Sequence, residues 1–154
     1  MNATITITLP ADRRSTGRLV FRSADGELKF SCPCLGRSAG HASNPTRDPL
    51  KYRGDTPTGR YALTFVTRLA APITGIGSLW IGLDPDDFYD TQARKAEKAG
   101  RTGLGIHGGR GDGLLKPTHG CVRLKDVDMA ALARIAGKTR FTVLIETAAQ
   151  GGAA

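Results

Sequence analysis

Alternating polar and apolar positions predict that this chain folds mainly as β-strands. Residues 4–9 (TITITL) alternate strictly and are rich in β-branched side chains, which is typical of a half-buried strand, and Pro10 ends the pattern. Five other segments have the length and the apolar composition of strands. They are 18–22 (RLVFR), 27–31 (ELKFS), 60–67 (RYALTFVT), 78–83 (SLWIGL) and 141–146 (FTVLIE).

A hairpin and a long loop are predicted between these strands. Asp25 and Gly26 form a pair that is typical of the turn between two paired strands. The composition then changes over 35–58, where Gly, Pro, Asn, Asp and Arg dominate, so we predict a loop there. A loop of this length inside a compact domain is often functional.

Two short helices are predicted. The first covers 91–98 (TQARKAEK) and is polar. The second covers 126–136 (DVDMAALARIA), where Val127, Ala131 and Ile135 form an apolar stripe, joined by Leu132, that we expect to face the core. The helices are a minor part of the chain, so the fold class that we predict is mainly β.

The length of 154 residues is typical of one domain, and the chain contains no internal repeat. We therefore expect a single domain over 1–154, with one or two short helices and a disordered tail at 148–154. No apolar run reaches the roughly 18 residues of a membrane span. The first residues also lack the basic and apolar regions of a secretory signal.

The charge of the chain favours anionic partners. It carries 22 Lys and Arg against 14 Asp and Glu, a formal net charge of +8. Nucleic acid, anionic membranes and acidic cell-wall polymers would all be attracted by such a charge. A nucleic-acid-binding module is therefore one alternative, although the chain lacks the aromatic stacking motifs and the binding folds of that class.

The cysteines do not form a disulfide framework. There are three of them, and an odd number argues against closed pairing. We expect Cys32 and Cys34 to be a buried pair of small side chains. Together with Cys121 and the histidines they could in principle bind zinc, but the spacings match no usual zinc site. A zinc-binding module is thus a second alternative of another class.

Residues 103–124 (GLGIHGGRGDGLLKPTHGCVRL) combine a cysteine, two histidines and many glycines. Cys121 can act as a nucleophile if a nearby base or positive charge favours its thiolate. His107 and His119 are both candidate bases, and position alone does not decide between them. Glycines allow a substrate to approach main-chain N–H groups, as an oxyanion hole requires. Trp80 is predicted to be a core side chain, with the wall of a substrate site as the less favoured alternative.

Two motifs in this segment identify a known family. The sequence IHGG at 106–109, followed by THGCVRL at 118–124, resembles the catalytic domain of the L,D-transpeptidases (YkuD-like). The upstream segment 55–61 (DTPTGRY) is also similar to that family, in which a loop there leads into a core strand. The resemblance covers about 55–146. The loop between His107 and Thr118 is shorter than the family often shows.

The resemblance implies a β-sandwich-like fold with the cysteine in a cleft. In it, His107 would be the base that deprotonates Cys121, and the carbonyl of Gly108 would orient the imidazole ring. His119 would line the site. The backbone N–H groups of Gly120 and Cys121 would stabilise the oxyanion.

A second group of residues would bind the substrate. Arg123 would hold a substrate carboxylate or the loop, because its guanidinium suits paired hydrogen bonds. Thr118 and Gly109 complete this group. The resemblance implies no metal and no cofactor.

The implied substrate is a peptidoglycan stem tetrapeptide. The cysteine would form a thioester with it, and an amine, a free D-amino acid or water would resolve the thioester. The outcomes are a 3-3 cross-link, an exchanged stem and L,D-carboxypeptidase action. Such enzymes work in the periplasm or cell wall, and no export signal is visible in this sequence. An alternative is therefore a secreted antibacterial effector that acts on a rival's cell wall, with an immunity or delivery partner.

Overall fold

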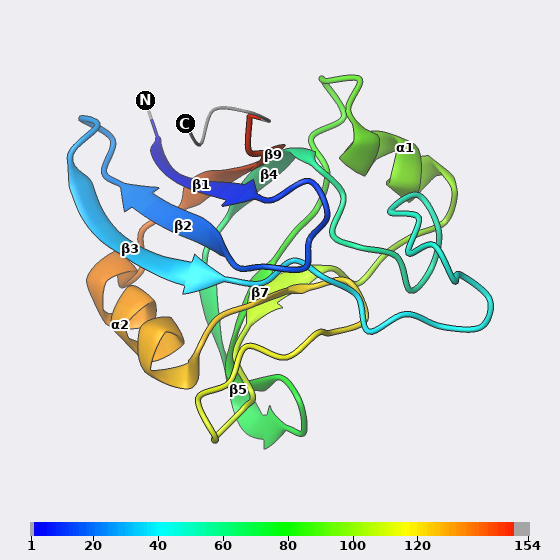
Figure 1. Cartoon of the computed structure of the whole chain (residues 1–154). Coiled ribbons are helices and arrows are strands. Elements are labelled where there is room, and N and C mark those ends of the chain that lie inside the picture. The colour runs from blue at the N-terminus through cyan, green and yellow to red at the C-terminus, as the bar shows by residue number, and fades with distance from the viewer. Residues whose placement is uncertain (1, 150–154) are drawn as a thin grey trace.

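A five-stranded sheet forms one layer of the fold. The structure is a computed structural model, and it describes residues 2–149 (Figure 1). The strand order is β3-β2-β1-β9-β4, in which β1 and β9 run parallel and the other neighbours run antiparallel. The strands are β1 (Ala3–Leu9), β2 (Gly17–Arg22), β3 (Leu28–Cys34), β4 (Gly59–Thr64) and β9 (Phe141–Thr147).

A four-stranded sheet forms the second layer, and two helices flank the sheets. The strand order of this second sheet is β5-β6-β7-β8, with β7 and β8 parallel. Helix α2 contacts β3 and β6, whereas α1 contacts β4 on the other side of the molecule (Figure 1). The elements are β5 (Val66–Ile73), β6 (Gly77–Gly82), β7 (Gly105–His107), β8 (Val122–Arg123), α1 (Gln92–Lys98) and α2 (Asp126–Ala136). The mainly β fold predicted from the sequence is confirmed.

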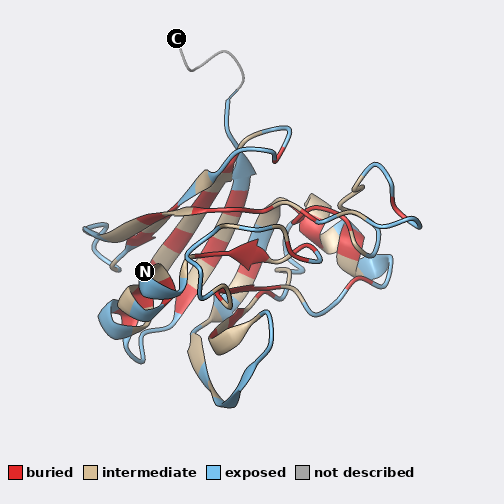
Figure 2. Ribbon diagram, turned by 60° about the horizontal axis from the view of Figure 1, so that its bottom comes forward, coloured by how far each residue is buried: buried red, intermediate tan, exposed pale blue. Residues whose placement is uncertain are grey.

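The hydrophobic core lies between the two sheets. Alternate residues of β1 are buried, as the alternating sequence predicts, and Ile5 and Ile7 have no exposed surface. Ile81 of β6 and Ile106 of β7 belong to the same buried cluster. Figure 2 shows the buried positions as bands across the strands, with exposed residues in the loops and on the outer side of α2. Burial on this scale is the main term that stabilises such a fold.

The buried face of α2 differs from the predicted stripe. Val127 is 71% exposed and Ile135 is 42% exposed, so the stripe that contains them faces solvent. Leu132 is buried as predicted, and Met129 and Ala136 are buried in place of Val127 and Ile135. Both stripes are apolar, and the one with the larger Met and Leu side chains packs onto β3 and β6.

Most strand boundaries agree with the prediction, and one predicted strand is divided. The segment 60–67 forms most of β4 and the start of β5, which belong to different sheets. The chain therefore passes from one sheet to the other near Phe65. The two-residue strand β8 was not predicted, because it is too short to show a pattern.

The long loop predicted at 35–58 is fixed by its own hydrogen bonds and lies against the segment before β8. The Asp55 carboxylate accepts the Ser38 N–H at 2.8 Å and forms an ion pair with Arg47. Isolated bridges pair Leu35 with Arg123 and Ser38 with Thr118. These contacts set the position of residues 118–123 relative to the rest of the fold.

Three further predictions concern the cysteines of β3, the C-terminal tail and membrane-spanning segments. Cys32 and Cys34 are buried and free, as predicted. Ala148, the first residue of the predicted disordered tail, donates its N–H to the Leu9 carbonyl at 2.7 Å, and residues 150–154 lie outside the described residues. Within 2–149, no helix has the length and apolar character needed to cross a membrane.

Candidate active site

Cys121 and His107 come from adjacent parallel strands and line the same cavity. His107 is the last residue of β7, and Cys121 directly precedes β8, which pairs with β7 through Ile106 and Val122. The cavity has a volume of about 450 Å³. It is lined by Ala39, Thr74, Gly75, Ile76, Trp80, Gly103, His107, Pro117, Thr118, His119, Cys121 and Arg123.

The His107 ring is held in one tautomer. Its Nδ1 lies 2.8 Å from the Gly108 carbonyl oxygen, which can only accept, so Nδ1 carries the proton and Nε2 keeps its lone pair. Trp80 stacks on the ring at a centroid distance of 5.7 Å and an interplanar angle of 13°. Burial lowers the pKa of His107, and the nearby Arg123 charge lowers it further, against the opposing effect of the Gly108 hydrogen bond. His107 therefore has the form of a neutral base.

Cys121 is the only one of the three cysteines that reaches the surface. It is half-buried, and its Sγ donates to the Gly103 carbonyl at 3.8 Å. Burial raises the pKa of the Cys121 thiol, while a hydrogen bond from Gly105 and the charges of Arg101 and Arg123 oppose this effect. Burial raises the pKa of Cys32 to about 12 and leaves that thiol unreactive.

The Thr118–Cys121 segment forms a tight turn that presents the cysteine. The Thr118 hydroxyl donates to the Cys121 carbonyl at 2.8 Å and accepts the Gly120 N–H at 2.9 Å. Gly120 has a φ of 120°, which only glycine adopts readily. Among residues 2–149 we find no acceptor for the Cys121 N–H. Of the two N–H groups expected from the sequence to act as oxyanion donors, that of Gly120 therefore already has an acceptor in this structure.

Arg101 supports this turn through hydrogen bonds from its guanidinium, and its role was not predicted from the sequence. Its side chain is buried and donates to the carbonyls of Gly54 at 2.5 Å and Asp55 at 2.8 Å. The guanidinium also donates to the Pro49 carbonyl at 2.5 Å and, in a longer hydrogen bond, to the His119 carbonyl at 3.4 Å. The guanidinium therefore links the 35–58 loop to the turn that carries Cys121. Nothing in the sequence distinguishes Arg101 from the other 21 basic residues.

We expect Arg101→Met to lower the free energy of unfolding by about 3 kcal/mol, because several buried carbonyls lose their donors together. The exposed Arg14, whose side chain makes no hydrogen bond among residues 2–149, provides the matched control. Arg14→Met should change the stability by less than about 0.5 kcal/mol. Urea denaturation of both variants measures the difference. Equal stability of the two variants would show that Arg101 is not a structural centre.

The predicted substrate-binding residues have different environments. Arg123 is buried and donates to the carbonyls of Gly108 at 2.6 Å, Lys116 at 2.9 Å and Gly75 at 3.3 Å, so its hydrogen bonds hold the loop. Thr118 lines the cavity, but its hydroxyl is used within the turn. Gly109 does not line the cavity, and its N–H donates to Asp126.

His119 and Trp80 both lie at the cavity. His119 is exposed, and its pKa is lowered by partial burial and by the charges of Arg53 and His41. Trp80 was predicted to be a core side chain. This prediction is wrong, since Trp80 is half-buried, lines the cavity and stacks on His107. Trp80 of β6 pairs with His107 of β7, so the two rings lie side by side, and the strand pattern of the sequence does not show this pairing.

Residues 2–149 contain no group of three or more His, Cys, Asp and Glu side chains that could hold a metal ion.

Fold and site together define a mainly β protein with a cysteine and a histidine in one cavity. The chain belongs to the L,D-transpeptidase catalytic domain family (YkuD), which matches residues 13–145. The matched region thus begins well before residue 55, where the motifs recognised in the sequence start.

Solved structures of other proteins share this fold. The helical cell shape determining protein Pgp2 of Campylobacter jejuni is 21% identical, with a TM-score of 0.60 over 97% of this chain and 49% of that one. Bd1075 of Bdellovibrio bacteriovorus is 19% identical, with a TM-score of 0.57 over 94% of this chain and 47% of that one. The chain spans about half the length of these proteins. No curated protein sequence matches it.

Proposed function

We propose that this chain is the catalytic domain of a peptidoglycan L,D-transpeptidase with Cys121 as the nucleophile and His107 as the base. One observation carries the proposal. The Gly108 carbonyl binds the Nδ1 proton of His107, so the Nε2 lone pair is free in the cavity that also contains Cys121. A nucleophile with a base that is oriented by a third group is the general arrangement of covalent acyl transfer.

The pair rests in its neutral form. Burial raises the pKa of Cys121 and lowers the pKa of His107, and both shifts disfavour a separated thiolate and imidazolium. In the proposed step, His107 takes the thiol proton as the sulfur attacks. Arg101 and Arg123 lie close enough to favour the negative charge that develops on sulfur.

The first half-reaction forms a thioester. Sγ of Cys121 attacks the carbonyl carbon of the third stem residue, and His107 Nε2 takes the thiol proton. The oxyanion accepts a hydrogen bond from the Cys121 N–H. When the C–N bond breaks, His107 returns the proton to the amine of the terminal D-amino acid, which leaves.

The second half-reaction regenerates the thiol. An acceptor amine or water attacks the thioester carbonyl and gives its proton to His107. The C–S bond then breaks, and the sulfur recovers the proton. The cavity of about 450 Å³ has room for an extended peptide segment, and the net charge of +8 favours a polymer that carries several carboxylates. Such a substrate places the enzyme in the periplasm or cell wall.

Mass spectrometry of purified disaccharide tetrapeptides tests the proposal. With the protein, we expect loss of the terminal D-amino acid, its exchange for an added D-amino acid, or a 3-3 linked dimer. The products also identify the acceptor. The intact protein should gain the mass of one acyl group, as it should with a carbapenem, and peptide mapping should locate that group on Cys121. If neither the muropeptides nor the protein changes in mass, the proposed chemistry is wrong.

A further inference from the structure

The peptide unit that orients His107 lies between two glycines. The Gly108 carbonyl accepts the Nδ1 proton of His107, and the N–H of the same peptide unit belongs to Gly109. Glycine has little preference among backbone conformations, so a peptide unit between two glycines can rotate easily. Rotation would break the hydrogen bond between the Gly108 carbonyl and His107 Nδ1, and the ring could then adopt the other tautomer. This peptide unit therefore needs contacts that hold it.

Two side chains donate to its oxygen. His107 Nδ1 lies at 2.8 Å and Arg123 Nη1 at 2.6 Å from the Gly108 carbonyl. Arg123 also donates to the Gly75 carbonyl in the turn between β5 and β6. A side chain at position 109 would overlap the backbone of this turn, so the turn closes one side of the peptide unit.

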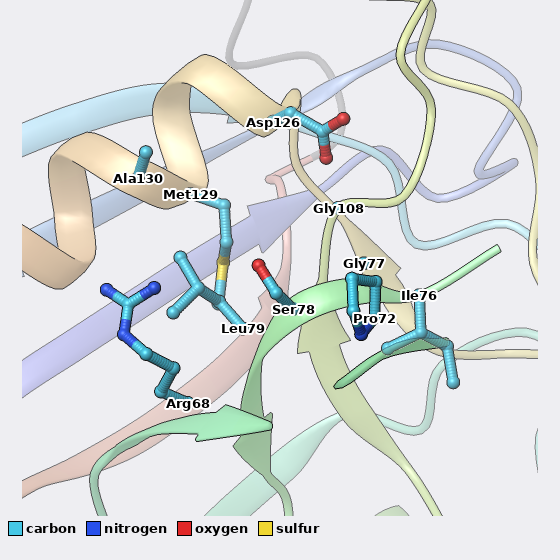
Figure 3. A pocket seen from close by; sticks show the side chains of 10 residues that line it. All are labelled: Arg68, Pro72, Ile76, Gly77, Ser78, Leu79, Gly108, Asp126, Met129 and Ala130. Carbon is cyan, nitrogen blue, oxygen red and sulfur yellow. The ribbon is translucent and has the colours of Figure 1, made fainter. Parts of the chain in front are cut away.

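One side chain accepts from its nitrogen. Asp126 Oδ1 lies 2.6 Å from the Gly109 nitrogen. A Cβ at position 108 would overlap this carboxylate oxygen, so the glycine is what allows the close approach. Figure 3 shows Asp126 at the start of α2, with its carboxylate directed toward the chain near Gly108.

The position of Asp126 at a helix start does not explain this hydrogen bond. Acidic residues in a first turn usually interact with the free N–H groups of their own helix. Lys125 is the N-cap of α2, and no side chain caps the helix. The Asp126 carboxylate turns away from α2 and binds a loop that comes from β7. Asp128 lies in the same first turn and is the natural comparison.

We propose that Asp126 is a positioning residue for His107. Its carboxylate holds the Gly109 N–H, which keeps the Gly108 carbonyl on Nδ1 and directs the Nε2 lone pair toward Cys121. The inference rests on the proposed function only in assigning His107 as the base. In addition to that function, it connects the Asp126 carboxylate to His107 through the main chain, by the two hydrogen bonds of the peptide unit between Gly108 and Gly109.

The hydrogen bond matters more than the charge in this link. Asp126 is exposed, and solvent screens its charge from the buried His107 ring. The charged or titratable groups around the ring are Arg123 from β8 and Cys121 before it, while the uncharged Trp80 from β6 covers one ring face. A neutral acceptor at position 126 should therefore keep most of the effect.

Alkylation of Cys121 by iodoacetamide at pH 7 tests the proposal without any peptidoglycan. The rate at Cys121, followed by peptide mass spectrometry, depends on the ability of His107 to accept the thiol proton. We expect Asp126→Ala to slow alkylation about tenfold, as loss of an orienting contact commonly does. Asp126→Asn keeps an acceptor oxygen and should stay within about threefold of the wild-type rate. Asp128→Ala should match the wild-type protein within about twofold, because Asp128 does not contact this peptide unit.

Nitrogen NMR of the histidine rings provides a second readout. Wild-type His107 should be the Nδ1-protonated tautomer, and Asp126→Ala should populate the other tautomer, whereas Asp126→Asn should not. Asp126 is exposed, so its variants should fold, and a thermal melt checks this. The proposal is overturned if Asp126→Ala keeps the wild-type rate and tautomer. It is equally overturned if Asp126→Asn or Asp128→Ala is as slow as Asp126→Ala. These results are independent of turnover, so a wild-type protein that leaves muropeptides unchanged would count against the proposed function alone.

Discussion

Replacing Cys121 with alanine is expected to abolish acyl transfer and to leave the fold intact. The variant has no nucleophile, so the thioester cannot form, and turnover should fall by at least about 10³-fold. The Cys121 side chain is half-buried, and its sulfur interacts only with main-chain groups, the Gly103 carbonyl at 3.8 Å and the Gly105 N–H. The free energy of unfolding should therefore change by less than about 1 kcal/mol. Muropeptide turnover and thermal unfolding, measured on the same sample, check both parts.

Cys32→Ala is the matched control and should show the opposite behaviour. Cys32 is buried in β3, away from the cavity, so the substitution should lower the stability by about 1 kcal/mol and leave turnover unchanged. Turnover by Cys121→Ala at a rate near that of the wild-type protein would contradict the assignment of the nucleophile. A parallel loss in both variants would indicate that the assay reports folding and not chemistry.

Replacing His107 with alanine should lower kcat/KM by about 10²–10⁴-fold at neutral pH, the usual contribution of a positioned base. The pH dependence should also change. Burial lowers the pKa of His107, so the wild-type protein keeps a neutral base, and its activity, to a lower pH than an ordinary histidine would allow. Without the base, Cys121 must ionise by itself, and burial raises its pKa. The residual activity of the variant should therefore increase with pH into the alkaline range.

Profiles of kcat/KM against pH distinguish these outcomes. His41→Ala is a suitable control, because His41 is exposed in the 35–58 loop and its ring bonds only to Ser43 among residues 2–149. This control should reproduce the wild-type profile. If His107→Ala loses activity but keeps the wild-type acid limb, another group supplies that limb, and His107 is not the base.

Much of the fold could be predicted because local sequence and local structure agree. Strand β1 alternates in sequence and in burial, and α2 has the predicted bounds. The division of 60–67 between two sheets could not be predicted, since both halves are equally strand-like. The choice of the buried face of α2 also depended on its partners, because the helix has apolar residues on more than one side.

The candidate site also contains some residues that a local motif identifies and others that only tertiary contacts identify. Cys121 and His107 could be named from the motif that surrounds them, and the structure brings them to one cavity. Arg101 and Asp126 could not, because each acts by donating to or accepting from main-chain atoms that are distant in sequence. Any exposed or buried position could provide such a contact, and no local pattern marks it.

The sequence by itself determined most of the strands and the motif that contains Cys121, His107 and the glycines around them, because motif and periodicity are local properties of the chain. Only the tertiary structure decided which groups surround the reacting atoms. In the folded chain the Gly120 N–H donates to Thr118, and the Arg123 guanidinium donates to three carbonyls. Trp80 stacks on His107, and the Asp126 carboxylate accepts the Gly109 N–H. The physical reason is that buried main-chain groups must find partners, and packing determines which side chains are within reach.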